Sequence, residues 1–483
     1  MLYEKQMIER RRVPFVAAHR RSRFYPYGCF RCLALIGAAV LLIVACSGSG
    51  SDDSAVAPPP GGQMAGSDSG SDAGAPTEAG AGGGARTEAG AAGTAGAPAL
   101  GSSGAGGTFS GPVSDAGASG AGDVFVPAPH PPFPLVTAHG GPVIQKIELV
   151  PVYFGIDPLQ AELESFNTWI VGSNFWKTVG ADYGVLPGMR LPAVHFDSAP
   201  ASPISDVQIA GWLDAQISSG SLPKPSAQTV FALFYPAGTT ITTDGSPSCS
   251  VFAGLHQSAS VANAVFTGEV SFVIIPRCSF SAGDELTIAT NVASHEYVEA
   301  ATNPFGNSNP AWLLDGKEGQ PLEAWQMLDG LEIADLCENQ SYDVIEGFTV
   351  QDIWSNSAAQ AGNNPCQPSD PRHPFFTVSA DATIYHAQPG ATLTVHARAW
   401  SNMPAPDWSL GVNWGLVPYS DFDGQAVLSR TTVNNGDELT ATVTVPASPP
   451  VADGRSVYRF TIDSIDPINP NFDHPWPIMI VVP

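Results

Sequence analysis

The sequence contains few basic residues and few charges of any kind. Of 483 residues, 20 are Lys or Arg and 45 are Asp or Glu, which gives a formal net charge of −25. Charged residues make up 13% of the chain, and the sequence has no basic stripe. Because phosphate contacts need clustered Lys and Arg, nucleic acid is excluded as a partner. Such an acidic chain suits solubility outside the cell and the binding of cations.

The sequence also lacks a convincing membrane span and a serine-nucleophile motif. Its N-terminal apolar run, residues 32–45, has 14 residues, which is short for a span and right for an export signal. No Gly-x-Ser-x-Gly elbow is present, and cysteine is scarce, with seven in the whole chain. The missing elbow disfavours serine nucleophile chemistry, and cysteine nucleophile chemistry is disfavoured because the four cysteines after the N-terminal segment are predicted to be paired.

The N-terminal segment is typical of a lipoprotein signal. Arg-rich residues 10–31 precede the apolar run, which ends in Ile-Val-Ala-Cys at 43–46 and so resembles a bacterial lipobox. We therefore predict a lipoprotein signal peptide at residues 1–45 and lipidation at Cys46. Outer-membrane lipid would then hold the chain in the cell envelope, facing the periplasm or the exterior. An uncleaved anchor helix or an ordinary cleaved signal is the alternative.

Residues 46–128 are rich in Gly, Ala, Ser and Pro and repeat Thr-Glu-Ala-Gly-Ala at 77–81 and 87–91. This composition lacks the apolar content of a core and predicts a disordered tether.

Four cysteines follow the tether, at Cys249, Cys278, Cys337 and Cys366. An even number in an exported protein predicts two disulfides, and three connectivities are open. Short loop closure favours Cys249–Cys278 with Cys337–Cys366.

Residues 129–370 mix strand and helix patterns. Apolar runs at 143–155, 229–235 and 270–275 predict buried strands, residues 252–258 an edge strand or a loop, and 347–354 a last strand. We expect helices opening at Asp157, after Ser173, over 206–217 and over 284–302 with Asp284 as the cap. Together these elements indicate one α/β or α+β domain.

Residues 371–483 show a different pattern. Seven short alternating runs, separated by Gly, Pro, Asn and Asp turns, predict an antiparallel β-sandwich of immunoglobulin-like size; they are 376–379, 392–400, 409–416, 426–433, 438–445, 456–463 and 477–482.

The helix predicted at 284–302 carries the clearest chemical motif, His295-Glu296-Tyr-Val-Glu299. Residues four apart share a helix face, so His295 and Glu299 have the spacing of the zinc-binding H-E-x-x-H helix, with Glu as the second ligand. Glu296 would be the general base. The preceding residues 286–294 carry no charge, and buried charges need a partner or a metal. The alternative is a solvated helix face with incidental charges.

A third zinc ligand must come from elsewhere. Glu332 and Asp335 are three residues apart and would share a helix face. We assign Glu332 as the ligand and Asp335 as the acceptor for the second N–H of His295; the reverse assignment and an ordinary acidic surface turn are the alternatives. His256 is a further candidate, as a ligand or a transition-state donor.

Residues 294–304, together with Glu-Ile-Ala-Asp-Leu-Cys at 332–337, resemble bacterial exported proteins similar to the plant phosphate-induced (EXORDIUM-type) family. Tyr-Phe-Gly at 153–155 and Trp-Ser-Asn at 354–356 add to the resemblance, which covers residues 143–366. It departs from the family pattern between Cys249 and His256, where six residues intervene. The resemblance implies an extracellular protein with a zincin-like fold.

Two functions agree with these observations. The first is a surface-anchored zinc metallopeptidase-like hydrolase acting on extracellular peptide, with the sandwich holding the substrate or a cell-wall polymer. The second is a non-catalytic cell-surface or adhesion protein in which the same residues form a structural metal site.

Overall fold

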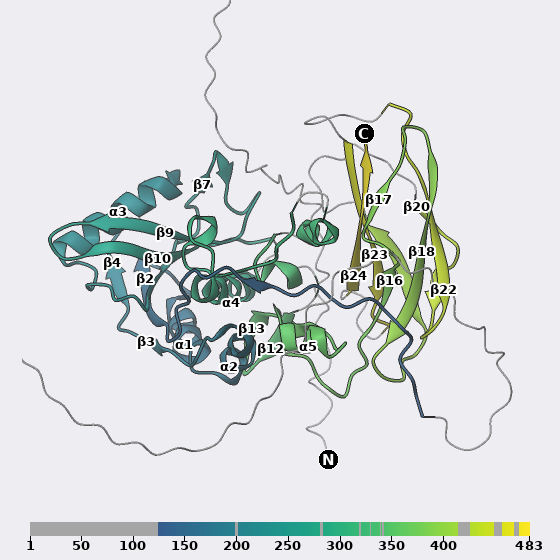
Figure 1. Ribbon diagram of the computed structural model, residues 1–483. Coiled ribbons are helices and arrows are strands. Elements are labelled where there is room, and N and C mark those ends of the chain that lie inside the picture. Colours follow the sequence, from purple (N-terminus) through teal and green to yellow (C-terminus); the bar gives the residue numbers. More distant parts are fainter. Residues whose placement is uncertain are drawn as a thin grey trace, which may run out of the picture. The chain divides into compact units, whose positions relative to one another are not determined.

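The computed structural model describes residues 124–483 apart from 199–200, 281–283, 318–319, 329, 339, 341, 414–425, 449–455 and 468–472. The predicted signal peptide, Cys46 and nearly all of the tether lie outside the described residues. The described part belongs to one compact unit and consists mostly of strands in several sheets, with few helices (Figure 1). Within it, no helix is both long and apolar enough to cross a membrane.

A six-stranded sheet organises the first part of the chain. Its three central strands run parallel, and β9 pairs antiparallel with β10 at one edge. The strands are β2 (Glu148–Phe154), β3 (Met189–Arg190), β4 (Val194–Phe196), β6 (Thr229–Phe234), β9 (Leu255–Ala262) and β10 (Thr267–Ile275). The predicted buried strands are present, and the uncertain segment at 252–258 leads into the edge strand β9.

Helices cover both faces of this sheet. Successive side chains of a strand point to opposite faces, so each buried strand contributes apolar side chains to two cores. Leu149 and Tyr153 belong to the core that contains the helices α1 (Gln160–Ile170), α2 (Asn174–Gly180) and α4 (Glu285–Thr302). Val150 and Val152 belong to the core on the other face, under α3 (Asp206–Ser219). The sheet thus lies between two helical layers, and α4 packs against β9 and β10 (Figure 1).

Two of the predicted helix starts are confirmed. The Ser173 hydroxyl accepts a hydrogen bond from the Trp176 amide, and a capping box opens α3 after Ser205.

One of the other two helices begins later than predicted, and α4 begins where predicted but without the expected side-chain cap. The helix α1 begins only at Gln160, because the Asp157 carboxylate accepts the Leu159 amide two residues on and pairs with Arg277 at 2.5 Å. Asp284 precedes α4 without capping it, because its carboxylate accepts hydrogen bonds from earlier residues.

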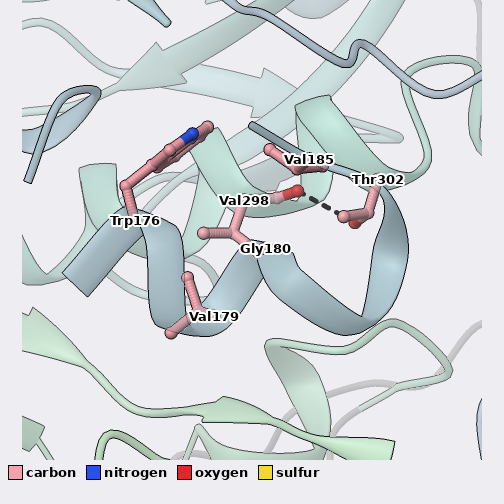
Figure 2. A pocket seen from close by; sticks show the side chains of 6 residues that line it. All are labelled: Trp176, Val179, Gly180, Val185, Val298 and Thr302. Atoms are coloured by element: carbon pink, nitrogen blue, oxygen red, sulfur yellow. Dashed lines mark hydrogen bonds between the residues drawn. The ribbon is translucent and has the colours of Figure 1, made fainter. Parts of the chain in front are cut away.

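The C-terminal part of α4 is fixed in the core. Val298 and Thr302 pack against Trp176, Val179 and Gly180 of α2, and the Thr302 hydroxyl donates to the Val298 carbonyl at 2.9 Å (Figure 2). These side chains leave no space large enough for a water molecule. Close packing here fixes the C-terminal turns of the helix that carries His295 and Glu299.

The chain between α4 and residue 370 forms short elements. Predicted strand 347–354 is two strands, β13 (Phe348–Gln351) and β14 (Ile353–Trp354), which pair separately with β12 (Tyr342–Ile345) and β15 (Cys366–Gln367). Both predicted disulfides, Cys249–Cys278 and Cys337–Cys366, are present. The remaining short elements are β1 (Thr137–Ala138), η1 (Ala181–Tyr183), β5 (Ile204–Ser205), β7 (Ile241–Thr243), β8 (Ser246–Pro247), η2 (Gly306–Ser308), β11 (Trp312–Leu313), η3 (Pro321–Leu328), η4 (Asp335–Cys337) and α5 (Asn356–Gln360).

Two further sheets form the C-terminal part and face a common core that includes Val378, Val395, Phe460 and Ile478. One contains, in order, β16 (Phe376–Ala380), β18 (Thr392–Ser401), β22 (Glu438–Thr444) and β20 (Ala426–Leu428). The other contains β17 (Ile384–His386), β24 (Asp473–Val482), β23 (Ser456–Ile465), β19 (Trp408–Asn413) and β21 (Thr432–Val433).

The strand pairing departs from the prediction in two places. The strand β17 was not predicted, and it runs parallel to β24, whereas we expected antiparallel pairing alone. The predicted run 426–433 is two short strands that join different sheets.

Candidate metal centre

The helix α4 brings three of the predicted residues together. His295 and Glu299 lie one turn apart, and the His295 Nε2 atom is 3.1 Å from the Glu299 Oε2 atom. Glu299 is 3% exposed and Glu296 is also buried. A buried carboxylate needs a counter-charge or a metal, so this face of α4 cannot be a solvated surface with incidental charges.

The edge strand β9 adds His256 to the same site. Alternation along the strand directs Gln257 toward α3, where it donates to the Asp206 carboxylate at 3.0 Å, and directs His256 toward α4. The His256 Nδ1 atom lies 3.4 Å from Glu299 Oε2 and 3.6 Å from Glu296 Oε2. The structure therefore brings this candidate into the predicted site.

Gly254 allows the strand to approach the helix. A Cβ atom at this position would lie 2.3 Å from the Val292 Cγ1 atom and 2.8 Å from the Glu296 Oε1 atom. Either distance is shorter than van der Waals contact, so any larger residue would displace one of these side chains.

Glu332 and Asp335 approach the site on separate sides. The Asp335 Oδ1 atom is 3.7 Å from His295 Nε2, whereas the Glu332 Oε1 atom is 3.5 Å from His256 Nε2. Our expectation that the two residues share a helix face is wrong, because Glu332 precedes the short helix η4. Its amide donates to the Asp335 Oδ2 atom at 3.0 Å, which turns the chain before η4 begins.

Gln351, at the end of β13, orients His295. The Gln351 Nε2 atom donates to the Ala334 carbonyl at 2.8 Å, so its Oε1 atom faces the His295 Nδ1 atom at 3.0 Å. The imidazole must therefore donate from Nδ1, and its Nε2 atom faces Glu299 and Asp335. Sequence reasoning missed Gln351, because only the position of β13 beside α4 brings it to the ring.

Asn303, just after α4, was also missed. Its side-chain amide donates to the Glu332 Oε1 atom, and its Oδ1 atom accepts the Ala311 amide at 2.9 Å. In the sequence, the Asn-Pro pair after residue 302 indicates only the end of the helix. The contact of Asn303 with Glu332 depends on how the chain folds back.

The site concentrates charge in a nearly dry environment. Burial by itself would lower the pKa of both histidines. The neighbouring carboxylates outweigh this effect and raise both pKa values well above that of a free histidine. The largest contribution comes from Glu332 for His256 and from Glu299 for His295. Burial raises the pKa of Glu332 to about 7 and that of Asp335 well above its usual range. Burial alone would raise the pKa of Glu299 too, but its two histidine neighbours hold that pKa well below the value of a free glutamate.

The donor atoms fit a transition-metal ion. Two sets of three, His295–Glu299–Asp335 and His256–Glu296–Glu299, each have their ligand atoms within 4.8 Å of one another. Imidazole nitrogen and carboxylate oxygen in such a set are ligands that zinc accepts. The geometry therefore favours Asp335 over Glu332 as the third ligand beside His295, which is the reverse of our first assignment.

Comparisons with known proteins add no family. The sequence matches no family model and no curated protein. Among solved structures, the chain is similar at 12% identity to the periplasmic chaperone SfaE, with a TM-score of 0.17, covering 22% of this chain and 56% of that one. It is similar at 8% identity to a beta-glucosidase from Listeria innocua, with a TM-score of 0.15, covering 72% of this chain and 48% of that one. The chain thus spans about half the length of each, and likenesses with such low TM-scores carry no argument about its fold or its function.

Proposed function

We propose that this chain is a surface-anchored, zinc-dependent hydrolase that acts on extracellular peptide. The observation that carries the proposal is the convergence of His295, Glu299 and Asp335 from two distant segments, with the Nε2 atom of His295 directed at both carboxylates. Lipid anchoring through Cys46 and location in the cell envelope rest on the lipobox-like signal alone.

A zinc ion bound there would act as a Lewis acid that polarises the scissile carbonyl. The protein groups would do the rest. His295, Glu299 and Asp335 would hold the ion, and Gln351 would keep the His295 ring in the ligating tautomer. Glu296 follows His295 directly and would accept a proton from the attacking water.

The proposal also includes a zincin-like domain and an immunoglobulin-like sandwich. A zincin-like domain is supported by the position of the His-Glu-x-x-Glu motif on a helix that packs against a mixed sheet beside its edge strand. An immunoglobulin-like sandwich is supported by two mainly antiparallel sheets with a shared core. The resemblance to the EXORDIUM-type family agrees with an extracellular protein.

A second function, a non-catalytic surface protein with a structural metal site, is favoured by burial. The side chains of Glu299, Glu296 and His256 are only 3, 7 and 8% exposed, and structural zinc sites are closed by protein ligands, whereas catalytic ones keep an open position.

The Glu296→Gln variant separates the two functions. Zinc-loaded wild-type chain and variant would be incubated with a pooled peptide library, and cleavage read by mass spectrometry, with chelator-treated protein as the control. We expect the wild type to cleave peptides and the variant to keep the zinc held by His295 while losing turnover. A wild type that holds zinc and cleaves nothing would leave the structural function in its place.

A further inference from the structure

We infer that the cluster binds two divalent transition-metal ions, one on His295 and one on His256, with the Glu299 carboxylate bridging them. The inference rests on the metal centre proposed above and adds a second ion position to it.

Each histidine has one nitrogen beside a neighbouring acceptor and the other directed inward. The Nδ1 atom of His295 faces the Gln351 carbonyl oxygen at 3.0 Å, and the Nε2 atom of His256 faces the Glu332 carboxylate at 3.5 Å. An acceptor behind the ring is how proteins fix the tautomer and orientation of a metal-binding histidine. Both rings are therefore arranged as ligands, His295 through Nε2 and His256 through Nδ1.

The two inward nitrogens converge on one oxygen atom. Glu299 Oε2 lies 3.1 Å from His295 Nε2 and 3.4 Å from His256 Nδ1, while the other oxygen, Oε1, accepts the Asp335 amide at 3.3 Å. The backbone thus holds this carboxylate from behind, and its remaining oxygen faces both imidazoles. A carboxylate so placed can serve two ions.

Each side is completed by a carboxylate of its own. Asp335 Oδ1 lies 3.7 Å from His295 Nε2, and Glu296 Oε2 lies 3.6 Å from His256 Nδ1. Ligand bonds of about 2.0–2.1 Å in tetrahedral geometry place neighbouring donors about 3.3 Å apart. The measured separations of 3.1–3.7 Å are close to that value on both sides.

One ion cannot take both histidines in this arrangement. Among the described residues, each set of three donors lying within 4.8 Å of one another contains a single histidine, and the two sets share only Glu299. Donors of one zinc ion would all fall within that limit, since each bond is about 2 Å long. The two sets therefore define two adjacent positions.

The second position changes the role of one residue. Glu296 becomes a ligand of the ion on His256 in place of a free proton acceptor, and Glu332 orients His256 from behind. The ligand sets are then His295–Glu299–Asp335 and His256–Glu299–Glu296.

The test is the metal stoichiometry of the purified full-length chain. Protein would be saturated with Zn²⁺, freed of unbound metal by gel filtration and analysed by mass spectrometry of the metal. We expect two zinc ions in the wild type, one in His256→Gln and one in Glu296→Gln. The exposed His396, on β18, supplies the matched control: His396→Gln should hold two.

A second readout uses Mn²⁺, whose magnetic resonance spectrum shows exchange coupling when two ions share a bridging carboxylate at the separation of about 3.5–4 Å typical of two-metal sites. We expect coupling in the wild type and its loss in His256→Gln. If that variant fails to fold by circular dichroism, Glu296→Gln decides the question.

One zinc ion in the wild type, or two in the folded variants, would overturn the second position and leave the first intact. No zinc in the wild type would also overturn the proposed metal centre, so the two failures are distinguishable.

Discussion

Replacing Gln351 with Met should weaken zinc binding without touching any metal ligand. Gln351 is 2% exposed, accepts from His295 Nδ1 and donates to the Ala334 carbonyl. Methionine has a similar volume but neither function, so the ring loses the acceptor that fixes its tautomer. Loss of such a partner typically reduces metal affinity by about 10- to 100-fold, or about 1.4–2.8 kcal/mol at 1.4 kcal/mol per factor of ten.

The Gln351→Glu variant separates orientation from general damage. Glutamate still accepts from His295 Nδ1 but cannot donate to the Ala334 carbonyl, and a buried acceptor left unsatisfied costs about 1–3 kcal/mol of stability. We therefore expect both variants to unfold at lower urea concentration, whereas zinc affinity falls strongly only in Gln351→Met. The exposed Gln360, at the end of α5, gives the matched control Gln360→Met, which should change neither quantity.

Zinc affinity would be measured by competition with a chromophoric chelator and stability by urea unfolding of the metal-free chain. A folded Gln351→Met chain that binds zinc as tightly as the wild type would refute the argument that this amide orients His295.

The structure makes three further predictions, two for the metal centre and one for the C-terminal sheets. Gly254→Ala places a methyl group against Glu296, and we expect a loss of about 1–3 kcal/mol in unfolding free energy from overpacking, with reduced turnover in a peptide-cleavage assay. Zinc binding at pH 7 should release protons, because both histidines have raised pKa values and the pKa of Glu332 is raised to about 7. Zinc affinity should therefore rise with pH. Calorimetry in two buffers of different ionisation enthalpy counts the released protons. Burial raises the pKa of Asp463, in β23, to about 6, so the folded state holds the proton to higher pH than the unfolded state. The contribution of this group to stability should therefore fall as pH rises from about 4 to 6. The Asp463→Asn variant should flatten that part of the stability curve, measured by urea unfolding.

The local part of the site could be predicted from the sequence, because helix periodicity alone places His295 and Glu299 on one face. The disulfide pairing also followed from short loop closure. The contributions of β9 and β13 could not be predicted in the same way. Only strand alternation and the packing of distant segments bring His256 beside Glu299 and Gln351 beside His295. His256 therefore stayed an open candidate and Gln351 was missed.

The acidic segment shows where a local rule failed. Three-residue spacing predicts a shared face only on a helix, but the Asp335 side chain accepts the Glu332 amide and turns the chain there. The two carboxylates consequently serve different histidines. In the C-terminal part, β17 escaped prediction because it has three residues and gains its place from pairing with β24, which alternation along so short a run cannot indicate.

The zinc content of the purified chain tests the metal centre most directly. After zinc loading and removal of free metal, the wild type should retain stoichiometric zinc, the double variant His256→Gln/His295→Gln should retain none, and His396→Gln should match the wild type. A wild type without zinc, or a folded double variant that retains as much zinc as the wild type, would contradict the assignment of these residues as a metal centre.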